Sequence, residues 1–148
     1  MFNLLSPVKD IMSTDLITIG KDATLEKVKE IFEENKIHHI PVVEFNQLIG
    51  IISKSDFLFF QKAYMHSDVH EEETRLKTHL AEEIMTKGIA KLDINDKINV
   101  ALEIFNENLF HAIPIESEGK LEGIVTTYDI INALAKSKGA VSEYPNAA

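Results

Sequence analysis

The chain has 148 residues, of which 45% are hydrophobic and 26% are charged, and its 15 basic and 24 acidic side chains give a formal net charge of −9. This composition is that of a globular protein and excludes wholesale disorder. The acidic balance excludes nucleic acid as a polymeric partner, because such binding neutralises phosphates with Lys and Arg. The absence of cysteine excludes disulfides, thiolate metal sites and cysteine nucleophiles.

The apolar segments are too short for the membrane. No run approaches the roughly 20 apolar residues that a spanning helix needs. The opening residues, MFNLLSPVKDIM, reach a proline and charged residues too early for a secretory leader. We therefore expect a cytoplasmic protein with no membrane partner.

The first half of the chain contains a clear order of elements. Residues 16–19 form a short β-prone run, and Thr24 is a candidate N-cap for a helix that we expect to end near residue 35. Two β-rich runs follow at 40–43 and 48–53, and a second helix is predicted to begin near Ser55 and Asp56. The predicted order is β-α-β-β-α.

An internal repeat extends this order to the second half. The Ile-Met pair at 11–12 recurs 73 residues later at 84–85. The same spacing relates EIFEEN (30–35) to EIFNEN (103–108), HHIPV (38–42) to HAIPI (111–115), and GIISKSD (50–56) to GIVTTYD (123–129). Similarity that keeps one register over such a length indicates a duplicated structural unit. The second copy then predicts strands at 89–92, 113–115 and 121–126, a helix carrying residues 98–105, and a last helix from Asp129.

The two copies are expected to form one core. A repeat of about 55 residues is marginal alone, and its sheet has an apolar face that needs a cover. We expect a mixed α/β (α+β) fold in which two pseudo-twofold-related β-α-β-β-α repeats pack sheet to sheet. The predicted boundaries are 8–62 for the first repeat, 63–79 for a helical linker, 80–136 for the second repeat and 137–148 for a flexible tail.

The paired motifs identify a family. Each repeat has a predicted strand with Ile-Pro, followed by the motif Gly-apolar-apolar-Ser/Thr-x-x-Asp before a helix. This pair of motifs, present twice, resembles the tandem CBS (cystathionine-β-synthase-type) domain pair, or Bateman module, over residues 8–135. The resemblance implies a stand-alone, non-catalytic regulatory sensor. It implies binding of AMP, ADP, ATP or S-adenosylmethionine in clefts between the repeats, no required cofactor, and signalling to a separate effector protein. It also implies assembly into dimers.

The polar candidates for ligand binding surround the start of each repeat's last helix. The resemblance assigns Asp56 and Asp129 to the ribose, whose diol suits two acceptor oxygens, although each can equally cap its helix. Ser53 and Thr126 offer hydroxyls at a helix N-terminus, which suits either phosphate or local main-chain bonds. Lys54 adds a cation in the first copy only.

The remaining candidates lie on or near the strands. The apolar ones, which would line a purine slot or simply belong to a strand edge, are Ile40, Pro41, Val42, Ile113, Pro114 and Ile115. Thr18 matches the family's first-strand threonine at the pocket wall. His38 and His111 recur at equivalent positions, as phosphate contacts or as hydrogen-bonded residues at the entry of a strand.

The two copies differ at the candidate positions. Lys91 stands where the first copy has Thr18, and Thr127-Tyr128 stands where it has Lys54-Ser55. We therefore predict different ligand preferences or one empty pocket. The lack of arginine near either motif favours AMP, adenosine or S-adenosylmethionine over tight ATP binding.

Two features point to other roles. His66 and His70 are four residues apart, a spacing that on a helix offers two imidazoles to a divalent metal or simply forms a solvated face. Residues 57–60, FLFF, make their helix apolar on more faces than one core can cover, whereas Ile130, Ile131 and Leu134 form a stripe that suits their own sheet. We expect a homodimer that uses mainly the first of these helices. The alternatives to an adenosine sensor are a metal-responsive module and a ligand-free dimerising scaffold.

Overall fold

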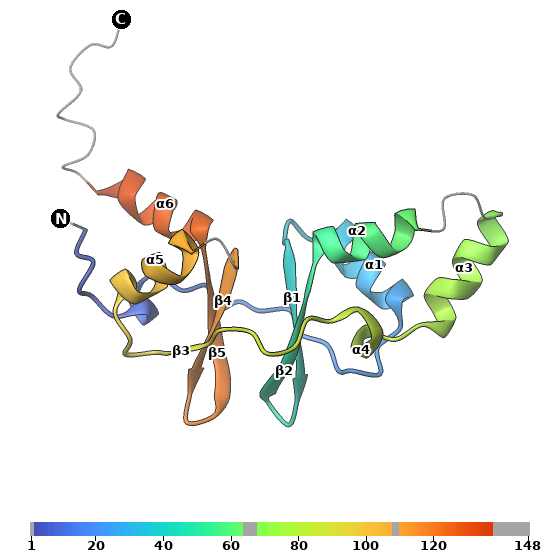
Figure 1. The fold of residues 1–148 in the computed structure, drawn as a ribbon, viewed down its shortest axis with the longest axis horizontal. Coiled ribbons are helices and arrows are strands. Elements are labelled where there is room, and N and C mark those ends of the chain that lie inside the picture. Colours follow the sequence, from blue (N-terminus) through green and yellow to red (C-terminus); the bar gives the residue numbers. More distant parts are fainter. Residues whose placement is uncertain (1, 64–67, 108–109, 138–148) are drawn as a thin grey trace, which may run out of the picture. The chain divides into compact units, whose positions relative to one another are not determined.

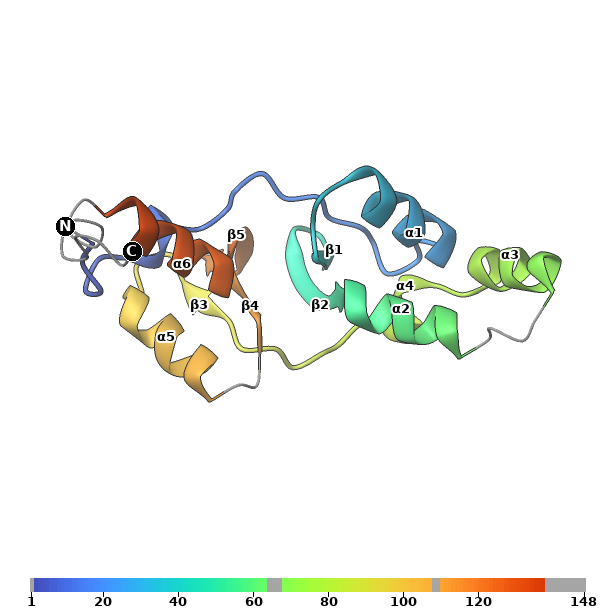
Figure 2. The same ribbon diagram turned by 90° about the horizontal axis from the view of Figure 1, so that it is seen from above.

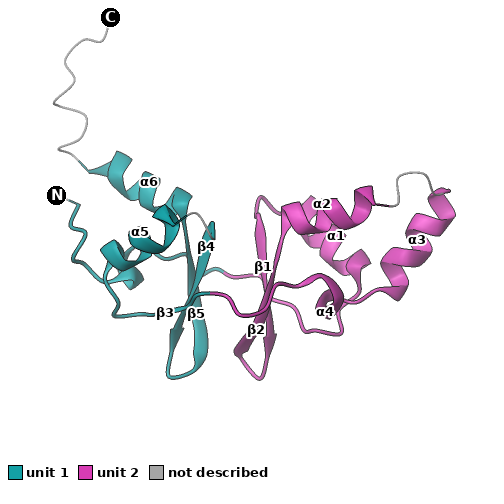
Figure 3. Cartoon of the chain, viewed as in Figure 1, with its two compact units in different colours: residues 1–15, 90–148 teal, residues 16–89 magenta. Residues whose placement is uncertain are grey.

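The computed structural model describes residues 2–63, 68–107 and 110–137. The chain divides into two compact units, of which unit 1 contains residues 1–15 and 90–148 and unit 2 contains residues 16–89 (Figure 3). The units therefore do not coincide with the repeats. Unit 1 joins the second repeat to the first Ile-Met pair, and unit 2 joins the first repeat to the second Ile-Met pair.

Unit 2 is built around an antiparallel hairpin of β1 (His39–Glu44) and β2 (Gln47–Ser53). The helices α1 (Leu25–Glu34) and α2 (Lys54–Lys62) lie on the same side of this hairpin in both views (Figures 1 and 2). Thr24 caps α1, since its side chain accepts a hydrogen bond from Lys27 N, which confirms the predicted start of that helix.

The first predicted strand is reduced to one bridge. Ile19 pairs in parallel with Val42, with Ile19 N donating to Pro41 O at 3.1 Å and Val43 N donating to Ile19 O at 2.9 Å. The predicted strand at 16–19 therefore pairs with β1 at Ile19 alone, because the segment leaves the edge of β1 after these two bonds.

Two further helices complete unit 2. They are α3 (Val69–Thr78), within the predicted linker, and α4 (Ala81–Ile84). Leu76 of α3 and Ala81 of α4 are buried in the same core as Leu25 and Val28 of α1. The predicted linker thus contributes a helix to the core of the first repeat; its residues 64–67 lie outside the described part of the chain.

Unit 1 has a three-stranded sheet in the order β3-β4-β5, with β3 parallel to β4 and β4 antiparallel to β5. The helices α5 and α6 lie on one side of this sheet (Figures 1 and 2). Val8 of the short 3-10 helix η1 joins their core, and its N–H donates to Asp96 O at 2.7 Å. The elements are η1 (Val8–Asp10), β3 (Leu92–Asp93), α5 (Ile98–Asn106), β4 (Ala112–Ser117), β5 (Lys120–Thr126) and α6 (Thr127–Lys136).

The expectation that α6 only covers its own sheet is wrong. Phe57 of α2 and Ile130 of α6 are equivalent positions, and both are buried. Tyr128, Ile131 and Leu134 of α6, however, remain 69%, 62% and 44% exposed. Ile131 projects about 100° around the helix from Ile130, beyond the stripe that the sheet covers. Both helices therefore carry exposed apolar side chains.

The helices are all short. No helix in the described part of the chain is long and apolar enough to cross a membrane. The predicted flexible tail lies, from residue 138 onward, outside the described part of the chain.

Candidate functional site

In unit 2, the candidate polar residues meet where β2 runs into α2. Ser53 ends the strand and caps the helix, since its Oγ accepts a hydrogen bond from Asp56 N at 3.0 Å. Lys54 N donates to His38 O at 2.8 Å, which fixes the residue before β1 against the first turn of α2. The structure thus brings His38, Ser53, Lys54 and Asp56 together at one end of the hairpin.

The two charged side chains of this group have no partner there. Asp56 is exposed and Lys54 is half-buried. Neither the Asp56 carboxylate nor the Lys54 ammonium makes a hydrogen bond or ion pair with any residue that the structure describes. The N-terminus of α2 adds the positive end of a nine-residue helix dipole. This end of the hairpin therefore presents an open pair of acceptor oxygens beside a cation and helix N–H groups.

In unit 1, the equivalent junction of β5 and α6 has the same main chain but different side-chain contacts. Asp129 Oδ2 accepts from Thr126 N at 2.7 Å and from Thr126 Oγ1 at 3.0 Å, and Thr126 Oγ1 accepts from Asp129 N at 3.3 Å. These bonds form a capping box. Asp129 Oδ1 accepts from Ser13 Oγ at 3.2 Å. His111 O accepts from Thr127 N at 3.4 Å, as His38 O does from Lys54 N.

The second candidate cation is also engaged. Lys91 Nζ lies 3.0 Å from Glu116 Oε1, in an ion pair between the residue before β3 and the strand β4. The first copy has Thr18 and Val43 at these two positions, so the ion pair belongs to the second copy alone. A phosphate at Lys91 would have to compete with Glu116.

The apolar candidates belong to the cores. Ile40 and Val42 are fully buried in unit 2, and Ile113 and Ile115 are fully buried in unit 1. Pro41 and Pro114 are buried to the same degree. A purine at these strands would therefore meet main-chain atoms rather than a slot of these side chains. Thr18, His38 and His111 are exposed.

Each Ile-Met motif packs against the glycine of the other repeat. A Cβ placed on Gly50 would lie 2.6 Å from Met85 Sδ, and one placed on Gly123 would lie 2.7 Å from Met12 Sδ and 2.9 Å from Ser13 O. The space beside each glycine, which has no side chain, is therefore filled by another segment of the chain. The first Ile-Met segment approaches β5, and the second approaches β2.

Sequence reasoning missed the residues after the Ile-Met motifs. Ser13 N donates to Ile124 O at 2.9 Å and Ile124 N donates to Ser13 O at 3.0 Å. Thr86 and Ile51 exchange the same two bonds at 2.9 and 3.0 Å. A hydroxyl residue directly after both Ile-Met pairs was the available signal.

Among the described residues, the structure provides no second metal ligand beside His70. His66 lies outside the described residues, and His70 is exposed on α3, where it lines a shallow pocket with Glu71, Thr74 and Arg75. The described residues contain no group of three or more His, Asp or Glu placed to hold a metal ion.

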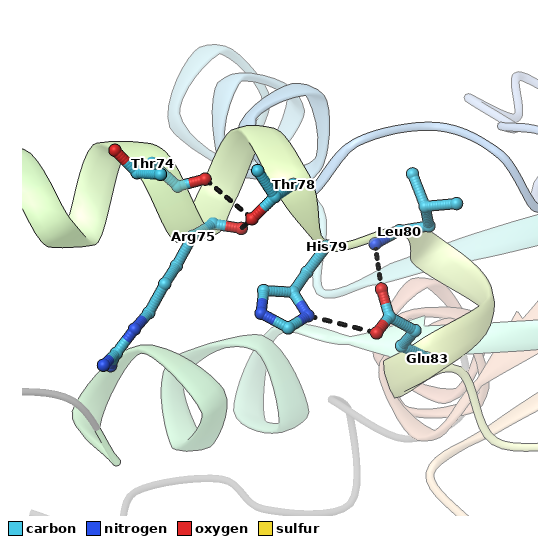
Figure 4. Close-up of polar contacts among 6 residues, drawn as sticks. All are labelled: Thr74, Arg75, Thr78, His79, Leu80 and Glu83. Atoms are coloured by element: carbon cyan, nitrogen blue, oxygen red, sulfur yellow. Dashed lines mark hydrogen bonds and ion pairs between the residues drawn. The ribbon is translucent and has the colours of Figure 1, made fainter.

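The junction of α3 and α4 is tied by Glu83 (Figure 4). Its carboxylate accepts a hydrogen bond from Leu80 N and lies 3.0 Å from His79 Nδ1. Thr78 Oγ1 donates to Thr74 O at 2.8 Å one turn earlier. The bond from Leu80 N, followed by that from His79, lowers the pKa of Glu83 below its ordinary value.

This shift predicts a local acid sensitivity. Because the pKa of Glu83 is lower in the folded chain, its contribution to stability is present above the unfolded pKa, about 4.3, and is lost as the pH falls through the folded value. Glu83→Gln retains an acceptor for Leu80 N without a titrating group. The excess stability of the wild type over this variant, measured by urea unfolding, should be larger at pH 7 than at pH 3. An equal difference at both pH values would contradict the assignment.

Comparison with known proteins agrees with the repeat. The family model of the CBS domain matches residues 8–63 and again 81–136. A CBS domain-containing protein of Dictyostelium discoideum is 27% identical over 132 residues, which cover 87% of this chain and 91% of that protein. An uncharacterised 17.7 kDa protein of Acidianus ambivalens is 30% identical over 129 residues, which cover 86% of this chain and 72% of that protein.

Other relatives are much longer than the matched segment. Inosine-5'-monophosphate dehydrogenase of Thermoplasma acidophilum is 29% identical over 122 residues, which cover 82% of this chain but 22% of the enzyme. The matched segment spans less than a third of the length of this dehydrogenase and of the uncharacterised protein MJ1404 of Methanocaldococcus jannaschii.

Solved structures share the fold. A putative acetoin utilization protein of Vibrio cholerae has a TM-score of 0.77 at 22% identity, with 97% of this chain and 100% of that chain covered. CBSX2 in complex with AMP has a TM-score of 0.72 at 22% identity, covering 88% and 96% of the two chains. The CBS domain pair of MJ0100, in complex with 5'-methylthioadenosine and S-adenosyl-L-methionine, has a TM-score of 0.71 at 22% identity, covering 88% and 97%. With two matched copies that include the Ile-Pro and Gly-x-x-Ser/Thr-x-x-Asp motifs, the chain belongs to the CBS domain family.

Proposed function

We propose that the chain is a non-catalytic regulatory module that binds an adenosine-containing ligand and signals to a partner protein. The observation that carries this proposal is the Asp56 carboxylate, which is exposed at the start of α2 and accepts no hydrogen bond from any described residue. A ribose presents two adjacent hydroxyl donors, and a carboxylate presents two acceptor oxygens that can take both. The first repeat therefore holds the better ribose site.

The charges around Asp56 favour a ligand with few phosphates. Lys54 is the cation beside it, and the single arginine of the chain, Arg75, lies on α3. One ammonium and a helix N-terminus suit a monophosphate better than the multiple charges of ATP. AMP, adenosine and S-adenosylmethionine are accordingly the preferred candidates. CBS domain pairs of the same fold occur in complexes with AMP and with S-adenosyl-L-methionine, which supports this ligand class.

A thermal-shift panel tests the function. AMP, adenosine, S-adenosylmethionine, ADP and ATP are compared with GMP, which has the same ribose phosphate but another base. A ligand at about 100 times its Kd stabilises the folded chain by about 2.7 kcal/mol, so AMP or S-adenosylmethionine should raise Tm by several degrees. A flat response to every adenosine compound at millimolar concentration would contradict the sensor and leave the scaffold alternative.

The exposed apolar side chains support a homodimer as part of this function. Leu58 and Phe59 of α2 are 39% and 78% exposed, and α6 adds Tyr128, Ile131 and Leu134. Neighbouring exposed apolar side chains, unlike single scattered ones, are typical of protein–protein interfaces. The proposed interface therefore uses both α2 and α6, and the solution mass from sedimentation equilibrium checks it.

A further inference from the structure

The two equivalent aspartates differ in how many bonds they have already made. The Asp129 carboxylate accepts three hydrogen bonds, two at Oδ2 from Thr126 and one at Oδ1 from Ser13. The Asp56 carboxylate accepts none from the described residues. The carboxylate of this motif is therefore free to accept hydrogen bonds from a ligand in the first copy, whereas in the second copy it already accepts hydrogen bonds from the protein.

The bond from Ser13 falls on the carboxylate oxygen of Asp129 that the capping box does not use. Asp129 Oδ2 is committed to the capping box of α6, and removing it from Thr126 N would break the carboxylate half of that box. Oδ1 lies outside the capping box, and it is this oxygen that Ser13 Oγ contacts at 3.2 Å. Three of the roughly four acceptor positions of this carboxylate are therefore occupied, and a ribose diol that donates both of its hydroxyls to Asp129 must displace the serine hydroxyl.

The main chain holds Ser13 in place. Ser13 exchanges two backbone hydrogen bonds with Ile124 of β5, and its carbonyl oxygen lies where a Cβ on Gly123 would come within 2.9 Å. The hydroxyl is thus presented to Asp129 by a segment that is already ordered, so little further entropy is lost in forming the bond.

The first repeat provides an internal comparison. Thr86 occupies the position of Ser13, 73 residues later, and makes the same two backbone bonds with Ile51. Its hydroxyl makes no hydrogen bond with any described residue, and Asp56 remains open. The same scaffold therefore presents a hydroxyl in both units, but only Ser13 occupies its carboxylate.

We propose that Ser13 acts as a built-in competitor for the ribose at Asp129. This inference rests on the proposed adenosine-binding function and assigns its order: the Asp56 site fills first, and the Asp129 site fills only at higher ligand concentration.

Isothermal titration with AMP on the full chain tests this order. The wild type should show one tighter and one weaker binding event. Asp56→Ala isolates the weaker event, and adding Ser13→Ala to that variant should tighten it about tenfold, the loss of one competing hydrogen bond to a charged group. Ser13→Thr, which retains a hydroxyl, should keep the weak affinity. Thr86→Ala is the matched control and should leave both events unchanged.

The outcomes separate this inference from the function on which it rests. An unchanged weak event in Asp56→Ala with Ser13→Ala, when the variant melts as a folded protein, overturns the competitor role and leaves the sensor function intact. A weaker or absent event in that variant overturns it as well, because Ser13 would then be a ligand contact. No heat of binding for AMP, adenosine or S-adenosylmethionine in the wild type or any variant overturns both.

Discussion

Asp56→Ala is expected to weaken adenosine binding at the tighter site by about 100-fold or more. Each hydrogen bond to a charged acceptor contributes about 1.5–3 kcal/mol, and the ribose diol would lose two of them. The stability of the ligand-free chain should hardly change, because the Asp56 carboxylate makes no hydrogen bond with the described residues and the cap of α2 comes from Ser53 Oγ. Isothermal titration with AMP and urea unfolding measure the two effects separately.

Asp129→Ala provides the contrast. It removes the two bonds that Thr126 donates to Asp129 Oδ2, the carboxylate half of the capping box of α6, while the bond from the main-chain N–H of residue 129 to Thr126 Oγ1 remains, so the free energy of unfolding should fall by about 1 kcal/mol. If Asp56→Ala destabilised the chain as much as Asp129→Ala, the open state of the first carboxylate would be wrong. If it left AMP affinity intact, the ribose assignment would be wrong.

Gly123→Ala is expected to destabilise the chain by about 2–3 kcal/mol. The added methyl would meet Met12 Sδ at 2.7 Å and Ser13 O at 2.9 Å, and a backbone oxygen held by Ile124 cannot move without breaking that bridge. Gly123 lies in the middle of β5, opposite Ile115 of β4, so the strand cannot shift away. Urea unfolding at constant m-value gives the loss directly.

Two other glycines calibrate this result. Gly50→Ala meets only the side chain of Met85, which can change rotamer, and should cost about 1 kcal/mol. Gly20→Ala meets nothing within 4 Å and should be neutral or slightly stabilising. Equal losses at Gly123 and Gly20 would exclude the Ile-Met packing as the cause.

Local signals predicted most of the secondary structure. Thr24 and the apolar residues at helical spacing gave α1 its start, and the polar turns between β-rich runs gave both hairpins, because these elements depend on neighbours in sequence. The two outer strands were overestimated. Of residues 16–19 only Ile19 forms a bridge, and of 89–92 only Leu92 belongs to a strand, β3, since both segments depend on pairing with distant strands.

The clustering of the candidate residues at the helix starts could be predicted from the sequence, but the hydrogen bonds that their side chains make could not. The repeated Asp, Ser/Thr and His positions were visible in the sequence, and the structure places those of each copy at one helix start. The difference between the copies was predicted from Lys54 and Lys91, yet the contacts that carry it come from Ser13 and Glu116. Ser13 and Asp129 are 116 residues apart in the sequence, so no local sequence pattern predicts their contact.

The division into units also orders the folding of the chain. Unit 2 is one continuous stretch, residues 16–89, and can close its core while the remainder is still being synthesised. Unit 1 needs its first 15 residues and its last strands together, so its nucleus must wait for loop closure across nearly the whole polypeptide. During synthesis, Met12 and Ser13 therefore stay without their partners Gly123 and Ile124 until β5 emerges. The N-terminal segment is therefore the last part of unit 1 to reach its folded position.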